Sequence, residues 1–191
     1  MRLANKSMTY ARRALCLSLE KICARVDGKL DDLQPAIDQL TVKQQPYLYA
    51  FASAWANWIQ INSADWNALA QLPKLTSMLQ QSAQLDESFD HGGAYLYLGV
   101  LSSQVPPSLG GKPEQGRDYF EKALTLSQEK NLMIKVMMAE HYARLVFDQE
   151  LHDQLLNEVL NSNPLQPELT LINTLAQTRA TQLLAESAEF F

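Results

Sequence analysis

A chain of 191 residues with ordinary apolar content, few Gly and Pro and a net charge of −5 is expected to fold around one sizeable core. No window approaches about eighteen uninterrupted apolar residues, which argues against a membrane-spanning helix. Residues 1–30 hold seven Lys/Arg against two Asp/Glu, whereas residues 31–191 hold nine against nineteen. Such an acidic body argues against nucleic acid as a partner, because phosphate binding needs a basic face.

The first predicted helix covers residues 3–26, where apolar residues recur at steps of three and four. Asp27-Gly28 ends it, with Gly where a left-handed turn costs least. Cys16 and Cys23 lie two turns apart on this helix, which would separate their Cα atoms by about 10 Å. A disulfide spans at most about 7 Å. Both cysteines are therefore predicted to be free, buried thiols, and they do not identify the compartment.

The next helices are predicted from starts, stops and apolar periodicity. The helix after Gln45-Pro46 is apolar on nearly every side, as expected for a helix packed between neighbours. The predicted helices in this part of the chain cover residues 30–40, 47–62 and 74–85, with a short helical turn starting at residue 65.

The central stretch, residues 85–127, is predicted to form two helices joined by a loop. A tetratricopeptide repeat has a large residue followed by Leu-Gly in its first helix, then a small residue, an aromatic and Ala-Leu in its second. Both half-patterns occur here, but their glycines are seventeen residues apart instead of about twelve, because the loop 106–111 is inserted. The residues that carry the pattern are Tyr95, Leu98, Gly99, Gly116, Phe120, Ala123 and Leu124.

Three more helices are expected after the central stretch. A long helix over 132–147 and a partner over 150–160 form another hairpin, and apolar spacing over 167–187 indicates a capping helix. No segment has the alternation of a strand. The predicted fold is all-α: a single domain, residues 1–191, built as a tetratricopeptide-like helical-hairpin solenoid with a C-terminal capping helix.

One cluster gathers carboxylates with an imidazole: Asp86, Glu87, Asp90 and His91. Glu87 and His91 are four residues apart and would share a helix face, which allows a metal site or an acid/base pair. The favoured alternative is that the acids cap the start of a helix and interact with its dipole.

The other polar motifs do not indicate catalysis. His141 and His152 are isolated and are interpreted as packing or surface residues. The GGKPE segment, residues 110–114, lacks the first Gly and the Lys-Ser/Thr ending of a phosphate loop. We expect its glycines to turn the chain and Pro113 to open a helix. No nucleophile elbow, metalloprotease motif or paired Cys-His set is present, so neither an enzyme, a metal nor a cofactor is predicted.

An aromatic group allows two interpretations, plain core packing, which is favoured, or a hydrophobic cavity between helix pairs. The group comprises Tyr47, Phe51, Trp55, Trp58, Tyr95 and Tyr97. The residues proposed for a ligand cleft are Phe51, Trp55, Trp58, Tyr95 and Tyr97.

Five ordered segments resemble the TRAP transporter T-component family, the periplasmic accessory proteins of some tripartite ATP-independent transporters. The most specific is the loop with the start of the following helix, whose signature residues are Pro106, Pro107, Gly110, Gly111, Lys112 and Pro113. The matching segments are PYLYAFASAWANWIQ (46–60), LDESFDHGGAYLYLG (85–99), VPPSLGGKPEQGRDYFEKALTLS (105–127), MAEHYARLVFDQELHDQLLNEVL (138–160) and LINTLAQTRATQLLAE (171–186).

The resemblance implies a non-enzymatic, tetratricopeptide-like protein that forms a homotrimer and partners the transporter's substrate-binding protein. It also implies a hydrophobic cleft that handles a small apolar or organic-acid ligand. Family members are exported lipoproteins, so we expect a periplasmic, lipid-anchored precursor of which this chain is a part. A cytoplasmic variant is the alternative, because no signal or lipid-bearing cysteine precedes the first helix.

Two other functions compete with the accessory role. One is a general tetratricopeptide-type scaffold that binds a peptide or helix along its groove, and the other is an all-helical metal enzyme using Glu87 and His91. For the inserted loop, residues 106–111, we expect an ordered conformation at a protomer contact or at the rim of a pocket.

Overall fold

The computed structural model describes residues 2–191, apart from the side chain of Leu109, and every regular element in them is a helix. No strand occurs in that part of the chain, which confirms the all-α prediction. The helices group into two compact units, unit 1 (Met1–Glu87) and unit 2 (Ser88–Phe191), which are described separately. The single-domain organisation of residues 1–191 stays a prediction.

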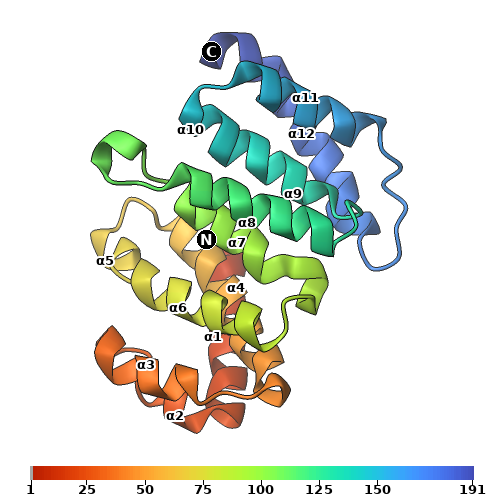
Figure 1. Ribbon diagram of the computed structural model, residues 1–191. Coiled ribbons are helices and arrows are strands. Elements are labelled where there is room, and N and C mark those ends of the chain that lie inside the picture. The colour runs from red at the N-terminus through yellow and green to blue at the C-terminus, as the bar shows by residue number, and fades with distance from the viewer. Residues whose placement is uncertain (1) are drawn as a thin grey trace. The chain divides into compact units, whose positions relative to one another are not determined.

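Unit 1 is built around the apolar helix α4, against which α1 and α6 pack, while α3 packs on α6 (Figure 1). Leu48, Phe51 and Leu75 are fully buried between these helices, as their positions on the inward faces predict. The elements of unit 1 are α1 (Arg2–Ser18), α2 (Glu20–Cys23), α3 (Leu30–Asp38), η1 (Val42–Gln44), α4 (Gln45–Ile61), α5 (Trp66–Leu69) and α6 (Leu72–Leu85).

The cysteine prediction is wrong, because residues 3–26 do not form one continuous helix. The chain leaves helical geometry at Leu19 (φ −132°, ψ 64°), between α1 and α2. Leu19 itself is buried in the core. This break brings the Cα atoms of Cys16 and Cys23 to 4.8 Å, and the two residues form a disulfide.

The helices α5 and α6 of unit 1 begin at residues whose local sequence favours a helix start. The side chain of Asp65 accepts a hydrogen bond from the backbone N–H of Asn67 (2.9 Å) and so caps α5. Pro73 lies in the first turn of α6, where its missing N–H costs no helical hydrogen bond. Pro35, in contrast, lies inside α3 and does not end it.

Unit 2 is organised around a core cluster that includes Phe120, Leu156 and Leu183, all fully buried. Its first two long helices, α7 and α8, lie side by side, and α11 packs on α12 (Figure 1). The elements of unit 2 are η2 (Phe89–Gly92), α7 (Gly93–Ser102), η3 (Pro107–Leu109), α8 (Pro113–Leu126), α9 (Leu132–Met137), η4 (Met138–Ala143), α10 (Arg144–Val146), α11 (Gln149–Asn161) and α12 (Thr170–Phe190).

The α7–α8 pair is antiparallel and depends on glycine at its crossing. A Cβ added at Gly99 would lie 2.9 Å from three ring atoms of Phe120, which is fully buried. On α8, a Cβ at Gly116 would collide with the hydroxyl of Ser103 and lie 3.1 Å from the carbonyl oxygen of Gly99. The two glycines therefore let the helix backbones approach closely, and this contact explains why the motif needs both.

The inserted loop folds into a defined turn. Within it, the Gly110 N–H donates to the Pro107 carbonyl (3.0 Å) and the Gly111 N–H to the Pro106 carbonyl (3.1 Å). Gly110 has a left-handed φ of 84°. Gly111 lies so close to the Val105 carbonyl that any side chain would collide with it. The expected position of this loop at a protomer contact or pocket rim stays a prediction.

The helix predicted over 132–147 is continuous but not uniformly α-helical, because its middle third, η4, has π geometry. It ends at Phe147, which is left-handed (φ 59°). The side chain of Asn131 caps its start by accepting from the N–H of Met133 (3.2 Å). Asn173 of α12, fully buried, accepts from the N–H of Leu132 and donates to the carbonyl of Lys130, both at 2.9 Å.

Candidate functional site

A cavity of about 480 Å³ in unit 1 is the best candidate for a binding site. Its volume lies within the ~300–1,000 Å³ usual for small-molecule pockets. The apolar part of its lining consists of Met8, Val26, Phe51, Trp55, Trp58 and Ala68. The polar part consists of Asn5, Thr9, Arg12, Asp27, Asn67 and Gln71.

Helix α4 supplies the three aromatic side chains of the lining. Phe51, Trp55 and Trp58 are spaced by four and three residues, which places them on one face of the helix. The rings of Phe51 and Trp55 are 5.2 Å apart, and both side chains are buried. Trp58 is half-buried, and its Nε1–H donates to Oδ1 of Asn5 on α1 (3.0 Å). The three residues thus form a wall whose orientation is set by packing and by one hydrogen bond.

The charged part of the lining centres on the pair formed by Arg12 and Asp27. Two guanidinium nitrogens of Arg12 donate to the two carboxylate oxygens of Asp27, with Nη1 to Oδ1 at 2.9 Å. The hydrogen bond from Arg12 holds the pKa of Asp27 below its ordinary value, and the nearby charge of Lys74 adds to the effect. Both residues are partly exposed, so the pair contributes little to stability.

Behind this wall lies a buried cation. Nζ of Lys74 donates to the carbonyl oxygens of Val26 (2.8 Å) and Gly28 (3.0 Å), and it lies 5.7 Å from the ring centroid of Trp55. Burial lowers the pKa of Lys74, and the charge of Asp27 opposes that shift. The turn after α2 is therefore held against the cavity by an ammonium group.

The proposed aromatic cleft residues are divided between the units. Tyr95 and Tyr97 lie on α7 in unit 2, where the ring of Tyr95 is 6.0 Å from that of Tyr119. Tyr47 is 43% exposed and does not line the cavity. Only the α4 members of the set line the cavity of unit 1, and a shared cleft with Tyr95 and Tyr97 stays a prediction.

The acidic cluster does not form the helical site that its spacing suggested. Asp90 (φ 51°) and His91 (φ 56°) are left-handed, and Gly92 (φ 78°) continues the turn. Helix α7 begins only at Gly93 and has no acid in its first turn. Glu87 and His91 therefore share no helix face. Nε2 of His91 lies 3.6 Å from a carboxylate oxygen of Glu168.

The left-handed turn removes the shared helix face that the metal or acid/base interpretation needs, whereas Asp90 does lie in the first turn of η2. Across residues 2–191, no three His, Cys, Asp or Glu side chains are grouped so that they could hold a metal ion. The Gly92-Gly93 pair was the local signal for the turn, because glycine adopts a left-handed φ at little cost. Gly92 also lies close to Ala123 and Leu126 of α8, where a side chain would be crowded.

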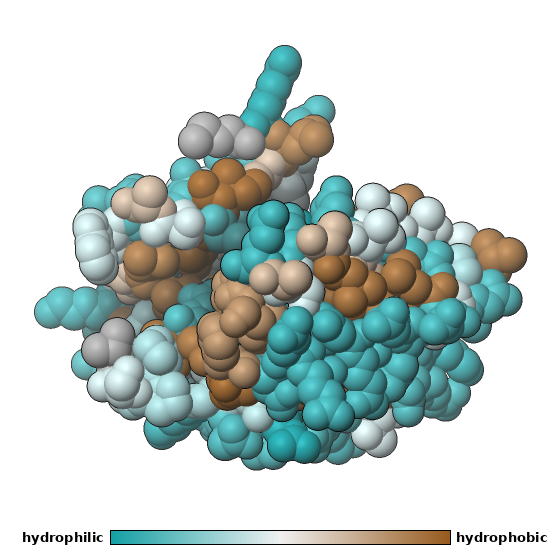
Figure 2. All heavy atoms as spheres, turned by 90° about the horizontal axis from the view of Figure 1, so that it is seen from above, coloured by the Kyte–Doolittle hydropathy of each residue, from teal (hydrophilic) through white to brown (hydrophobic). Residues whose placement is uncertain are grey.

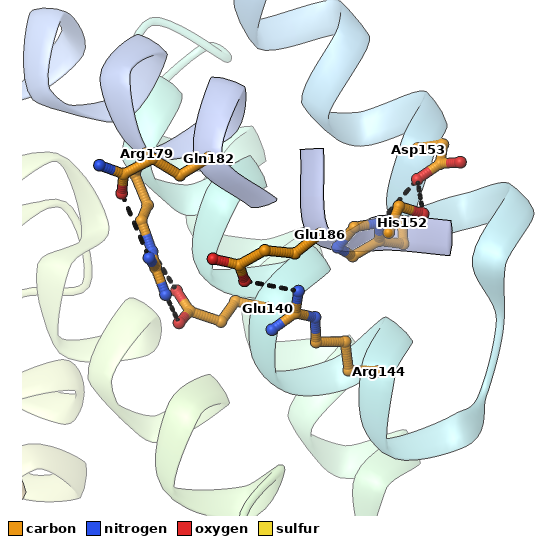
Figure 3. A network of polar contacts seen from close by, with 8 residues as sticks. Glu140, Arg144, His152, Asp153, Arg179, Gln182 and Glu186 are labelled. Atoms are coloured by element: carbon orange, nitrogen blue, oxygen red, sulfur yellow. Dashed lines mark hydrogen bonds and ion pairs between the residues drawn. The ribbon is translucent and has the colours of Figure 1, made fainter. Parts of the chain in front are cut away.

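Both isolated histidines are packed in unit 2. His152 is fully buried, and its Nδ1 lies 2.8 Å from Oδ1 of Asp153, which also accepts from the hydroxyl of Ser187 at 2.7 Å (Figure 3). Burial alone would raise the pKa of Asp153, but these two hydrogen bonds lower it below its ordinary value. Burial lowers the pKa of His141. In the described part of the chain, Nε2 of each histidine is buried without a hydrogen-bond partner.

Two ion pairs join η4 and α10 to α12 in the same region. Arg179 pairs with Glu140, and Nη2 of Arg144 lies 3.4 Å from a carboxylate oxygen of Glu186 (Figure 3). The guanidinium of Arg144 also lies 4.4 Å from the ring centroid of Phe190. These contacts connect the helices of unit 2.

Sequence reasoning missed the polar residues of the unit 1 cavity. Arg12, Asp27 and Lys74 come from three separated segments, and none belongs to a motif. The only signal was the excess of basic residues in residues 1–30.

The family comparison covers the whole chain. A family model described as TRAP transporter T-component matches residues 1–191. The chain belongs to the TRAP transporter T-component family. No curated protein matches the sequence. Membership confirms the resemblance carried by the loop and helix segments, and it assigns the protein to an accessory family of TRAP transport systems.

The cavity of unit 1 is thus a feature of a T-component-family protein, and the family is one of transport accessories. No helix among residues 2–191 has the length and apolar character needed to cross a membrane. The chemistry of the cavity, with aromatic rings on one side and hydrogen-bonding groups on the other, suits reversible binding of a small molecule.

Proposed function

We propose that this protein is a non-enzymatic accessory component that partners the substrate-binding protein of a TRAP-type transporter. The observation that carries this proposal is the match of the family model to all 191 residues. A match over the full length supports the whole architecture and not one shared motif. The role proposed for the cavity is to hold a small ligand that passes to or from that partner.

The tetratricopeptide-like solenoid and the homotrimer are part of the same proposal. The close crossing of α7 and α8 at Gly99 and Gly116 supports a repeat of this class. Large apolar side chains at the surface support protein contacts, and Figure 2 shows one face with hydrophobic residues gathered between hydrophilic ones. The large apolar side chains exposed in unit 1 include Leu3, Tyr10 and Leu17, and those exposed in unit 2 include Phe147, Leu171 and Leu175.

A periplasmic location is proposed as well, with a lipid anchor in the precursor. The disulfide between Cys16 and Cys23 supports it, because such bonds persist in oxidising compartments such as the bacterial periplasm. Free thiols, as predicted from the sequence, would say nothing about the compartment. The break at Leu19 allows the disulfide, and the disulfide supports the periplasm.

The decisive experiment combines association and mass. The chain is co-expressed with the solute-binding protein encoded by a neighbouring gene, and one of the two carries an affinity tag. We expect co-purification of the untagged protein and a mass of three chains in native mass spectrometry. A monomer that leaves the solute-binding protein behind, or a gene neighbourhood without such a protein, contradicts the proposal.

A second candidate function, a peptide-binding scaffold, is supported by a groove of about 640 Å³ between α3 and α6. Four of its ten lining residues are glutamines, and amides can both donate to and accept from a peptide backbone. The glutamines of the groove are Gln34, Gln80, Gln81 and Gln84. If this groove binds the partner, the double variant Gln80→Ala/Gln84→Ala loses co-purification; if it does not, association is unchanged.

A further inference from the structure

The outer face of α1, in unit 1, carries three large apolar side chains that are mostly exposed. Leu3, Tyr10 and Leu17 are 83%, 59% and 81% exposed. They follow one another at steps of seven residues, and such residues lie nearly in line along a helix of about 3.6 residues per turn. The buried Ala4 and Leu15 mark a different side of α1 as the one that faces the core. Helix α1 therefore presents an apolar stripe along most of its length of about 25 Å.

Exposed cations lie beside this stripe. Lys6 lies between Leu3 and Tyr10 along the helix, three residues from one and four from the other. Arg13 has the same position between Tyr10 and Leu17. Nζ of Lys6 is 5.9 Å from the centroid of the Tyr10 ring. The sequence of α1 contains no Asp or Glu, so no carboxylate of this helix offsets these charges.

Packing within unit 1 fixes this face before any partner binds. Helix α1 packs along α4, and the Nε1–H of Trp58 on α4 donates to Oδ1 of Asn5 on α1 (3.0 Å). At the other end, α1 stops before the non-helical Leu19, and the disulfide joins its last turn to α2. A helix that is folded in advance loses little conformational entropy when it binds a surface.

An apolar stripe with a basic flank matches the surface of an anionic membrane. A helix that lies in the membrane interface buries its apolar side chains among the acyl chains and holds Lys and Arg near the headgroups. The exposed leucines of α12, Leu171 and Leu175, lack such a flank. Helix α12 has one cation, Arg179, and it is paired with Glu140. The flank therefore distinguishes the exposed apolar surface of α1 from that of α12.

We propose that the outer face of α1 binds a membrane surface that contains anionic lipids. Leu3 and Leu17 enter the acyl region, Tyr10 lies at the headgroup level, and Lys6 and Arg13 contact lipid phosphates. Residues 31–191 hold nine Lys/Arg against nineteen Asp/Glu, so the same lipids repel the rest of the chain and favour approach through α1. This inference goes beyond the proposed accessory function and does not need a lipid anchor. It leaves the apolar surface of unit 2 to protein contacts.

The test uses the chain without any attached lipid and two kinds of vesicle. One kind is phosphatidylcholine alone, and the other contains about a quarter phosphatidylglycerol, which is anionic. Co-sedimentation measures binding, and we expect about tenfold tighter binding to the anionic vesicles, weakening as salt is added. Far-UV circular dichroism should stay unchanged on binding, because α1 is already helical.

Two double variants separate the apolar and the charged contributions. Leu3→Ser/Leu17→Ser removes most of the stripe and should weaken binding to the anionic vesicles by about tenfold or more. Lys6→Gln/Arg13→Gln should reduce that binding to the level of the neutral vesicles. All four side chains are exposed, and circular dichroism verifies that each variant is folded.

Each variant has a matched control. Leu171→Ser/Leu175→Ser removes two exposed leucines from α12, and Lys29→Gln/Lys43→Gln removes two exposed charges from unit 1 outside α1. We expect the first control to bind the anionic vesicles like the unchanged chain. The second should retain most of the preference for them.

Several outcomes overturn the proposal. These are equal binding to both kinds of vesicle, no binding to either, and the same loss of binding in the α1 and α12 leucine variants. If the unchanged chain does not bind vesicles and Leu3→Ser/Leu17→Ser lowers the mass in native mass spectrometry, the stripe is a contact between copies instead. Failure here with retained co-purification of the solute-binding protein removes only the membrane contact. Vesicle binding without co-purification removes only the accessory role.

Discussion

The helix pair α7–α8 of unit 2 and the α1–α4 pair of unit 1 are both close helix contacts, but the first is tightly filled and the second borders a cavity. In α7–α8, glycine brings the backbones together and leaves no room for another atom beside Phe120. The α1–α4 pair instead borders a cavity of about 480 Å³, which is lined by aromatic side chains of α4 and by residues of α1. The tetratricopeptide-like signature thus marks the filled contact, whereas the polar residues of the open site belong to no motif.

The largest effect is expected from filling the glycine contact. Gly99→Val places a branched side chain against the ring of Phe120, which is fully buried and cannot move aside. We expect the free energy of unfolding to fall by about 3 kcal/mol or more, the upper range for overpacking. Thermal and urea unfolding monitored by circular dichroism measure it. All three tryptophans lie in unit 1, so their fluorescence reports on that unit separately.

A rescue variant controls this experiment. Gly99→Ala is expected to cost less than Gly99→Val, and Phe120→Leu in the same chain should recover part of the loss by giving up ring volume. If Gly99→Val melts like the unchanged protein, the contact is looser than described, and the comparison with α1–α4 fails.

In unit 1 the corresponding stabilisation comes from a covalent bond. The double variant Cys16→Ser/Cys23→Ser opens a loop with a sequence separation of seven residues. We expect a loss of about 2 kcal/mol from the chain-entropy relation. Tryptophan fluorescence during urea unfolding measures it. The unchanged protein in excess reductant should match the variant, and coincidence of oxidised and reduced protein would contradict the disulfide.

These two helix pairs also show what the sequence could predict. Helix periodicity and the Gly99–Phe120–Gly116 pattern identified the α7–α8 pair, because both signals are local. The break at Leu19 was missed because no Gly or Pro marks it, although Leu19 is buried and its backbone is non-helical. Local helix propensity alone therefore predicted a Cα–Cα separation of about 10 Å for Cys16 and Cys23, roughly twice the observed 4.8 Å.

The candidate site was predictable only in part, for the same reason. The aromatic spacing on α4 marked three lining residues, whereas Arg12 and Asp27 meet only because the chain turns back after α2. At the acidic cluster, a helical spacing was assumed where left-handed residues interrupt the helix. Tertiary contacts, which no single segment encodes, decide all of these positions.

A third prediction concerns a mostly buried lysine of unit 2, Lys135, which pairs with two carboxylates. Nζ of Lys135 donates to carboxylate oxygens of Glu129 (2.9 Å) and Glu158 (2.8 Å), and the Lys135 side chain is only 11% exposed. Lys135 is thus paired with two carboxylates, whereas Nζ of Lys74 in unit 1 donates to backbone carbonyl oxygens. Lys135→Met should lower the free energy of unfolding by about 1–2 kcal/mol at neutral pH.

The pH dependence of this loss has a definite sign. Burial alone would lower the pKa of Lys135, but its two carboxylate partners raise it, so the stabilisation persists until pH exceeds that raised value. The hydrogen bond from Lys135, then that from Gln154, lowers the pKa of Glu158, so its stabilisation disappears as pH falls through the lowered value. Urea unfolding should show the full difference between about pH 5 and 10, and a smaller one below about pH 4. A difference that is constant across this range contradicts the ion pairs.

The smallest effect is expected in the inserted loop, where strain can be separated from packing. Gly110 has a φ of 84°, and a Cβ added there meets no atom within 4 Å. Gly110→Ala should therefore cost only the backbone strain, about 1 kcal/mol, and Gly110→Asn less, because Asn tolerates the left-handed region. Gly111→Ala should cost more, since its Cβ collides with the Val105 carbonyl. Thermal unfolding followed by circular dichroism ranks the three variants by their loss of stability. If the turn keeps this conformation, the loss increases from Gly110→Asn to Gly110→Ala to Gly111→Ala. Equal melting of all three would mean that the loop adapts freely, and it would remove the loop from the rigid part of unit 2.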